Sequence, residues 1–283
     1  MNKTLNGAFG VCGAGTMGSG IAYAAAMAGY TVRLFDITQE AVERGVKTVN
    51  KFLASGIERG KITQEIADAA VARLQPTTSL EQFSDCAVVV EAIVERMEVK
   101  KNLFTQLAAI VRPDCILASN TSSLPITELA NGIPNPERVV GMHFFNPAHI
   151  MKLVEVIEGF QTSPTVMDAT VALSSELGKT PVRAKDTPGF IVNRVARNFY
   201  GESFRIVGEG AATHDQIDRC MKAIGFKMGP FELMDLIGID VNFAVTQSVY
   251  DLYFNEARFR PHLIQRKMVE SGLLGKKSGK GFY

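Results

Sequence analysis

The sequence predicts an α/β fold in which a mostly parallel, doubly wound sheet is followed by an all-helical C-terminal domain. Three observations lead to this prediction. A strand-like run near the N-terminus ends in the glycine-rich segment 13–20, and strand and helix patterns then alternate as far as Lys185. From Thr187 onward only helical patterns follow. We therefore expect one domain over residues 1–186 and a helical domain over residues 187–283.

The individual elements follow from apolar runs and from helix start and stop signals. The expected strands are residues 9–12, 31–35, 86–91, 115–119, 138–144, 153–157 and 181–185. The expected helices are residues 21–28, an interrupted stretch over 40–74, 97–111, 164–178 and 188–210, with further helices starting near residues 215, 230, 240 and 261. Ser163 followed by Pro164 is a typical helix start, and Thr187 followed by Pro188 suggests another.

The first strand runs into a loop that has the spacing of a dinucleotide-binding motif, and this predicts a Rossmann-type domain. The loop comprises Gly13, Ala14, Gly15, Thr16, Met17 and Gly18. Gly13 allows the tight turn, Gly15 lets a pyrophosphate approach the backbone, and Gly18 lets the helix pack closely. Asp36 ends the next strand, where its carboxylate can bind a ribose diol and repel a 2′-phosphate. The pattern therefore predicts NAD, and disfavours NADP.

Composition excludes several classes of partner. Residues 4–32 carry no charged side chain and could imitate a signal peptide or a membrane span, but their glycines and polar residues favour strand, turn and helix. The 30 basic and 29 acidic residues nearly balance, so we expect neither nucleic acid nor a membrane as a partner. The four cysteines show no metal-ligand or disulfide spacing, which suggests no metal site and a reducing cytoplasm.

Polar residues interrupt two apolar strands and follow a third. His143 lies near the end of one strand, and Glu155 lies on the buried face of the next. A base and the carboxylate that orients it would explain both, because a lone buried carboxylate is costly. The loop 119–123 is rich in hydroxyls that could bind a substrate oxygen, although an ordinary turn is an equal alternative. A structural role for His143, or a competing role for His149, also stays open. These residues predict an NAD-dependent dehydrogenase with histidine as proton acceptor.

Several segments together resemble the L-3-hydroxyacyl-CoA dehydrogenase family, in particular its short single-function bacterial 3-hydroxybutyryl-CoA dehydrogenases. The resemblance covers essentially the whole chain, and the matching segments are residues 13–18, 90–95, 119–123, 143–147, 151–155, 185–194, 228–232 and 275–283. It implies the reversible oxidation of (S)-3-hydroxyacyl-CoA to 3-ketoacyl-CoA with NAD, on short acyl chains, in fatty acid or butyrate metabolism. It also implies a cytoplasmic homodimer formed through the helical domain.

The resemblance assigns roles to individual residues. His143 is implied as the catalytic base and Glu155 as its partner, while Ser122 and Asn193 would hold the oxygen on carbon 3 of the substrate. Asn193 is expected in the second turn of the helix capped by Thr187, so the helical domain would contribute to the site. Besides Asp36 at the adenosine ribose, the residues implied along NAD are Glu95, Lys100, Ser122, Asn146 and Lys277.

Coenzyme A carries phosphates, and the family binds them with basic side chains after the second strand. Lys51 and Arg59 are the candidates in this chain, and Arg59 is the first choice. They share this region with Arg44, Lys47 and Lys61, and the alternative for all five is a solvated helix face. The family's usual lysine-rich stretch is replaced by residues 55–61, so the contact residue stays open.

Three other functions compete with this interpretation. Dehydrogenases of the 3-hydroxyisobutyrate or 6-phosphogluconate type use a catalytic lysine and lack the segment His143–Pro147. An L-gulonate-type dehydrogenase has a related frame and does not use CoA. Related proteins also serve as non-enzymatic lens components. The presence of Ser122, His143, Glu155 and Asn193 together counts against a loss of catalysis.

Overall fold

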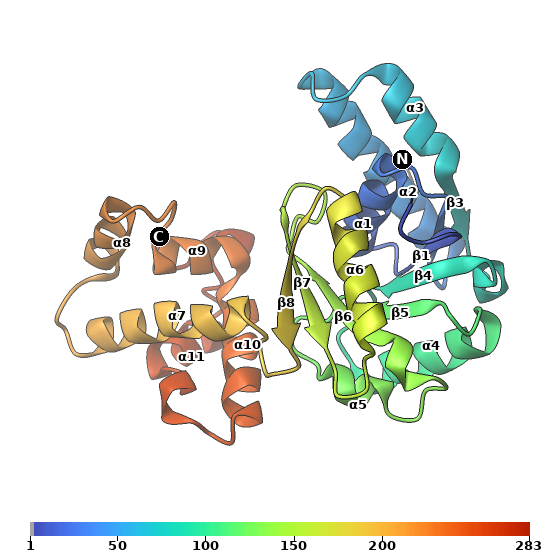
Figure 1. The fold of residues 1–283 in the computed structure, drawn as a ribbon. Coiled ribbons are helices and arrows are strands. Elements are labelled where there is room, and N and C mark those ends of the chain that lie inside the picture. The colour runs from blue at the N-terminus through green and yellow to red at the C-terminus, as the bar shows by residue number, and fades with distance from the viewer. Residues whose placement is uncertain (1–2) are drawn as a thin grey trace. The chain divides into compact units, whose positions relative to one another are not determined.

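The computed structural model describes residues 3–283, which divide into two compact units on either side of the Asp186–Thr187 bond (Figure 1). The first unit contains a sheet with its helices, and the second contains helices. None of the helices among these residues is both long and apolar enough to cross a membrane.

The sheet of the first unit has eight strands in the order β3-β2-β1-β4-β5-β6-β7-β8. Their bounds are β1 (Ala8–Cys12), β2 (Val32–Phe35), β3 (Leu74–Thr77), β4 (Cys86–Glu91), β5 (Ile116–Ser119), β6 (Val139–Phe144), β7 (Leu153–Glu158) and β8 (Thr180–Lys185). Neighbouring strands are parallel except β6 and β7, which are antiparallel. The predicted fold class is therefore confirmed.

Strand β3 is the one strand that the sequence pattern does not predict. It pairs with β2 at the edge of the sheet, where Leu34 lies opposite Pro76. Proline is tolerated at such an edge because only one side of the strand needs ladder hydrogen bonds. The short segment is polar and only partly buried, so it has no apolar run by which to be recognised.

The helices of the first unit are α1 (Thr16–Met27), α2 (Gln39–Glu58), α3 (Gln64–Arg73), α4 (Met97–Ile110), α5 (Ile126–Ala130) and α6 (Pro164–Glu176), with 3₁₀ turns η1 (Leu80–Phe83) and η2 (Pro136–Arg138). The predicted stretch over residues 40–74 is two helices, and Figure 1 shows their connection lying away from the sheet. As predicted, Ser163 caps α6 by accepting a hydrogen bond from the Val166 N–H, and Pro164 is its first residue.

The core of the first unit explains why its strands are apolar along their whole length. Strands β1 and β4 are buried at every position, as expected for parallel strands covered on both faces. Val11 and Val90 from these strands share one core cluster with Ile21 of α1 and Leu173 of α6. This core fixes the carboxyl ends of the parallel strands along one edge, where the predicted site residues follow.

The second unit contains α7 (Val192–Gly208), α8 (His214–Ala223), α9 (Pro230–Ile237), α10 (Ile239–Leu252) and α11 (Leu263–Glu270), with 3₁₀ turns η3 (Ala257–Phe259) and η4 (Lys276–Ser278). Its core includes Phe204, Phe231 and Met234, which are fully buried.

The start of α7 differs from the sequence prediction. The helix begins at Val192, because Gly189 (φ +74°) and Phe190 (φ 48°) adopt left-handed conformations that end any helix started at Pro188. Asn193 therefore lies in the first turn of α7, and the prediction that placed it in a second turn is wrong.

Candidate active site

Several of the predicted residues of the first unit follow the carboxyl ends of the parallel strands β1, β2 and β5. Strand β1 lies between β2 and β4. The strands that follow β1 directly in sequence, β2 and β3, add to one side of it, and the later strands β4 to β8 add to the other side. In open α/β sheets, such a switch point leaves a crevice in which ligands bind. The glycine loop follows β1, Asp36 follows β2, and the loop containing Ser122 follows β5.

The three glycines of the loop have different physical reasons to be glycine. Gly13 has φ +102°, and a Cβ there would lie 2.5 Å from the Ala92 carbonyl oxygen. A Cβ on Gly18 would lie 1.7 Å from the Gly13 carbonyl oxygen, so both positions exclude a side chain for internal reasons. A Cβ on Gly15 would meet no protein atom within 4 Å. The missing side chain at Gly15 therefore leaves room for a group from outside the protein.

Gly15 also lies at the N-terminus of α1, a position that favours the binding of an anion. Gly15 is the N-cap and supplies no side-chain hydrogen bond, and the first turn of the helix holds no acidic residue. Thr16 is exposed and Met17 is partly exposed beside it. The unpaired N–H groups and positive dipole end of a helix bind phosphate in this geometry. These residues fit the pyrophosphate of NAD.

Asp36 joins the end of β2 to the glycine loop. One oxygen of its carboxylate, Oδ2, accepts a hydrogen bond of 2.8 Å from the Ala14 N–H, and Oδ1 accepts one of 2.8 Å from the Ile37 N–H. The half-buried side chain is thus held in place at the end of the strand. That is where a dinucleotide-binding site needs a carboxylate for the ribose.

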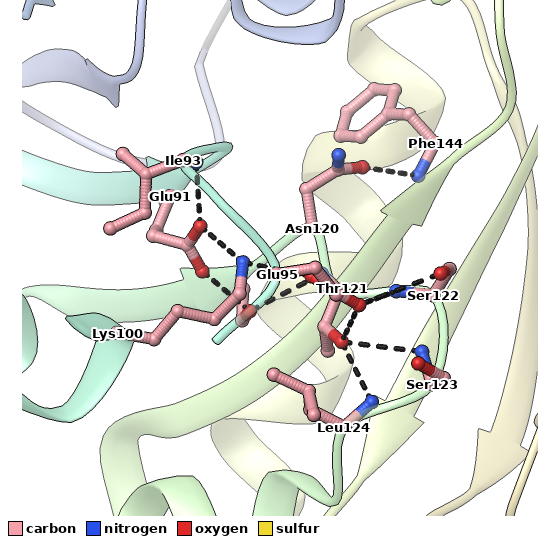
Figure 2. A network of polar contacts seen from close by, with 11 residues as sticks. Glu91, Ile93, Glu95, Lys100, Asn120, Thr121, Ser122, Ser123, Leu124 and Phe144 are labelled. Carbon is pink, nitrogen blue, oxygen red and sulfur yellow. Dashed lines mark hydrogen bonds and ion pairs between the residues drawn. The ribbon is translucent and has the colours of Figure 1, made fainter. Parts of the chain in front are cut away.

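A second group of polar contacts connects the ends of β4 and β5 (Figure 2). Glu95 Oε1 accepts hydrogen bonds from the Thr121 hydroxyl at 2.6 Å and the Ser122 N–H at 2.9 Å. Lys100 Nζ lies 3.1 Å from Glu95 Oε2 and 2.5 Å from Glu91 Oε1. Burial alone would raise the pKa of Glu95, but the Lys100 charge and the hydrogen bonds from Thr121 and Ser122 outweigh it and lower that pKa.

The hydroxyl-rich loop after β5 is also a turn. Thr121 Oγ1 accepts hydrogen bonds from the Ser123 N–H at 3.2 Å and the Leu124 N–H at 2.8 Å. Asn120 Oδ1 accepts a hydrogen bond of 2.8 Å from the Phe144 N–H at the end of β6. The loop is therefore an ordered turn, held by the Thr121 hydroxyl and by the neighbouring strand β6.

His143 and Glu155 form a buried pair. They lie directly opposite each other on the antiparallel strands β6 and β7, with Nδ1 2.7 Å from Glu155 Oε2. The two residues are only 6% and 1% exposed. A carboxylate at Nδ1 keeps the proton on that nitrogen, which leaves Nε2 as the nitrogen that can exchange a proton. A general base held by an orienting carboxylate requires a contact of this kind.

His149, the competing histidine, has a different environment. Its ring stacks on Phe52 of α2 with the centroids 3.6 Å apart and contacts the Tyr23 ring edge-on. Burial lowers its pKa, and the charges of Lys179 and Arg59 lower it further. Of these two histidines, His143 is the one with a carboxylate partner.

The remaining predicted residues occupy three other places. Lys51 and Arg59 are exposed on α2 and at its C-terminal cap, and Asn146 is exposed after β6. In the second unit, the Asn193 carbonyl accepts a hydrogen bond of 3.0 Å from Arg197 Nε, and Lys277 pairs with Asp240 at 2.5 Å. Among residues 3–283, no group of three or more His, Cys, Asp or Glu side chains could hold a metal ion.

Two buried charged residues of the first unit were not singled out by the sequence. Glu91, the last residue of β4, is fully buried, and the acidic end of an apolar strand was the available signal. Lys179 is 9% exposed, and its ammonium donates hydrogen bonds to the carbonyls of Ala148 at 2.5 Å and Met151 at 3.0 Å. Burial lowers the pKa of Lys179 to about 8, and nearby Lys152 adds to the effect. No sequence pattern marks Lys179, because its partners are backbone carbonyls.

Comparison with known protein families shows which family the chain is related to. Residues 8–187 match the NAD binding domain of 3-hydroxyacyl-CoA dehydrogenase, and residues 189–283 match its C-terminal domain. The chain belongs to the 3-hydroxyacyl-CoA dehydrogenase family. This confirms the predicted family and fold class, NAD as the family's cofactor and the predicted class of NAD-dependent dehydrogenase.

Individual relatives span different lengths. The chain is 49% identical over 274 residues to a 3-hydroxyadipyl-CoA dehydrogenase of Escherichia coli K12, covering 96% of this chain and 58% of that protein. A crystal structure of a 3-hydroxybutyryl-CoA dehydrogenase from Escherichia coli K12 has a TM-score of 0.97 at 49% identity, covering 99% of this chain and 60% of that one. The (S)-3-hydroxybutyryl-CoA dehydrogenase of Ralstonia eutropha has a TM-score of 0.95 at 42% identity and is covered over 98% of both chains.

Proposed function

We propose that the chain catalyses the reversible NAD-dependent oxidation of (S)-3-hydroxyacyl-CoA to 3-ketoacyl-CoA. One observation carries this proposal. A buried histidine paired with a carboxylate, His143 with Glu155, lies on β6 and β7 of the same sheet whose strand β1 leads into the glycine loop. The family membership supplies the substrate class, and the pair supplies the acid–base group that the reaction requires.

His143 is the proposed proton acceptor and donor. In oxidation, Nε2 takes the proton of the 3-hydroxyl, and in reduction the protonated ring returns it to the forming alkoxide. Glu155 holds the ring orientation and stabilises its charged form. When bound, NAD supplies the group that accepts hydride from carbon 3. Ser122 and Asn193 are the proposed hydrogen-bond partners of the substrate oxygen, as the resemblance implies.

The proposed NAD contacts follow the same reasoning. The loop 13–18 and the N-terminus of α1 bind the pyrophosphate, and Asp36 binds the adenosine ribose. The further contacts proposed from the resemblance are Glu95, Lys100, Ser122, Asn146 and Lys277. Lys100 is 1% exposed and lies between two carboxylates, so much of its proposed effect passes through Glu95.

For the acyl-CoA, short chains such as acetoacetyl-CoA and 3-hydroxybutyryl-CoA are the first candidate substrates, and the related structures carry that name. The 49% identity to a 3-hydroxyadipyl-CoA dehydrogenase makes a six-carbon dicarboxylic acyl chain the second candidate. Lys51 and Arg59, exposed on and beside α2, are the proposed contacts of the CoA phosphates.

The decisive experiment compares initial rates of NADH oxidation with 3-ketoacyl-CoA substrates of four to sixteen carbons and with 3-ketoadipyl-CoA. Highest kcat/KM for acetoacetyl-CoA supports the first candidate, and highest kcat/KM for 3-ketoadipyl-CoA supports the second. Turnover of free hydroxy acids without CoA substrates would favour the L-gulonate or 3-hydroxyisobutyrate alternatives. Binding of NADH without any turnover would favour a non-enzymatic relative.

We also propose a homodimer formed through residues 187–283 and a cytoplasmic location. The dimer follows from the family resemblance, and a molar mass twice that of the chain in analytical ultracentrifugation would support it. All four cysteines are free, and three of them are buried, which suits a reducing compartment. Cell fractionation of the producing organism tests the location, and recovery outside the cytoplasm would contradict it.

A further inference from the structure

Glu91 has an unusual environment for a charged residue. It is the last residue of β4, and its side chain is completely buried. Its Oε1 accepts a hydrogen bond of 2.7 Å from the Ile93 N–H and contacts the Lys100 ammonium, and its Oε2 accepts one of 2.7 Å from the Ser119 hydroxyl. A buried carboxylate is retained only where such partners offset its desolvation. Every one of these partners belongs to β4, β5 or the segments that follow them.

Two routes lead from Glu91 to the backbone of Ser122. In the first, Glu91 fixes Lys100, Lys100 pairs with Glu95 at 3.1 Å, and Glu95 accepts the hydrogen bond of the Ser122 N–H. Figure 2 shows this sequence of contacts. The Lys100 ammonium is thus shared between a fully buried carboxylate and one whose side chain is 40% exposed. Glu91 therefore anchors the cation that restrains Glu95.

The second route uses the Ser119 hydroxyl. Ser119 Oγ donates to Glu91 Oε2 and accepts a hydrogen bond of 3.2 Å from the Thr121 N–H. The Asn120 N–H also donates to the Glu91 carbonyl at 2.8 Å. The residues that precede Ser122 are consequently tied to the end of β4 by both the side chain and the backbone of Glu91.

We infer that Glu91 is a positioning residue for NAD binding, which sets Glu95 and Ser122 through Lys100 and Ser119 without touching the ligand itself. This inference rests on the proposed function, because it takes Glu95 and Ser122 as NAD contacts. The buried charge holds these two groups in one arrangement before the ligand arrives, so the ligand does not have to order them. Removing that charge leaves Lys100 with a single carboxylate and frees the loop.

The test is a fluorescence titration of NADH, which needs no turnover. The variant Glu91→Gln keeps the size of the side chain and removes its charge, and we expect it to raise the NADH Kd about tenfold. Lys100→Met should have a similar effect. Because both substitutions act through the same contacts, the double variant should also raise the NADH Kd only about tenfold. Independent effects would multiply and raise the Kd about a hundredfold.

Controls separate this role from general stability. Glu176→Gln changes a carboxylate of the same unit that binds Thr4 and Tyr30, and we expect its NADH Kd to stay within twofold of wild type. If Glu91→Gln does not fold, Ser119→Ala tests the second route and should raise the Kd about threefold. Wild-type affinity in a folded Glu91→Gln variant, wild-type affinity in Ser119→Ala, or a hundredfold effect in the double variant would overturn the inference. A wild-type protein that binds NADH but turns over none of the 3-ketoacyl-CoA substrates, 3-ketoadipyl-CoA included, would contradict the proposed function alone.

Discussion

The two parts of the site in the first unit are built in opposite ways. At the ends of β1 and β2, the decisive features are backbone N–H groups, missing side chains and the Asp36 carboxylate. At the ends of β4 to β7, the decisive features are buried polar side chains, including the pairs Glu91–Lys100 and His143–Glu155. The first part depends on shape and the second on charge balance. Adding a methyl group should therefore damage the first, and removing a charge should damage the second.

The largest expected effect comes from the buried pair of β6 and β7. His143→Ala removes the proposed proton acceptor, and Glu155→Gln removes the carboxylate proposed to orient it. A positioned base contributes on the order of 10²–10⁴-fold, so we expect kcat with acetoacetyl-CoA to fall at least about a hundredfold in either variant. NADH affinity should stay within a few fold of wild type, because neither residue is among the proposed NAD contacts. Near-normal turnover in either variant would contradict the assignment.

The next largest effect distinguishes the roles of two glycines in the same loop, Gly15 and Gly18. Gly15→Ala adds a Cβ that meets no protein atom, so the protein should keep its stability while the NADH Kd rises at least about tenfold from the clash with the pyrophosphate. Gly18→Ala adds a Cβ against the Gly13 carbonyl, and we expect about 3 kcal/mol of lost stability. Thermal unfolding and NADH titration measure the two outcomes. Equal effects of both substitutions on stability would show that Gly15 serves packing.

We propose that Asp36 controls the choice of coenzyme. Asp36→Asn keeps an oxygen that can accept the Ala14 N–H and removes the charge that repels a 2′-phosphate. We expect kcat/KM for NADPH relative to NADH to rise about tenfold, or about 1.4 kcal/mol. Glu40→Gln removes an exposed charge from the start of α2 and should leave the ratio unchanged. A ratio unaltered in Asp36→Asn would place coenzyme selection elsewhere.

The smallest expected effect concerns pH and Lys179. Its pKa is lowered to about 8 in the folded protein, from an ordinary value near 10.5 in the unfolded chain. Between these values the unfolded chain binds more protons, so the free energy of unfolding rises with pH. Denaturation at pH 7 to 10 should show a rise on the order of 1 kcal/mol above pH 8 that is absent in Lys179→Met. Lys47→Met, which changes an exposed lysine of α2, should keep the rise, and a rise retained in Lys179→Met would show that another group causes it.

The contrast between the glycine loop and the buried polar side chains also explains which features could be predicted from the sequence. The glycine loop and the alternating elements are local patterns, and the fold class they predict is confirmed by the structure. His143 and Glu155 were recognisable because polar residues inside apolar strands are costly and therefore rare. Their direct opposition across β6 and β7 depends on an antiparallel register, which no local pattern states.

Other features of the structure are not indicated by any pattern in the nearby sequence. Lys179 binds backbone carbonyls, and the partners of Glu91 come from segments up to 28 residues away along the chain. The displaced start of α7 depends on the left-handed conformation of Phe190, a residue type that rarely adopts it. Strand β3 exists because β2 offers it an edge, so it follows from tertiary pairing more than from its own residues.

We propose that the glycine loop binds the cofactor through its shape, while the buried pair His143–Glu155 performs the acid–base chemistry. Gly15→Ala and His143→Ala test it side by side, through the NADH Kd and the single-turnover rate of acetoacetyl-CoA reduction at saturating NADH. We predict opposite patterns: weaker NADH binding with a near-normal rate for Gly15→Ala, and near-normal binding with a rate at least about a hundredfold lower for His143→Ala. If both variants lose binding and rate together, the division between the two parts of the site is wrong.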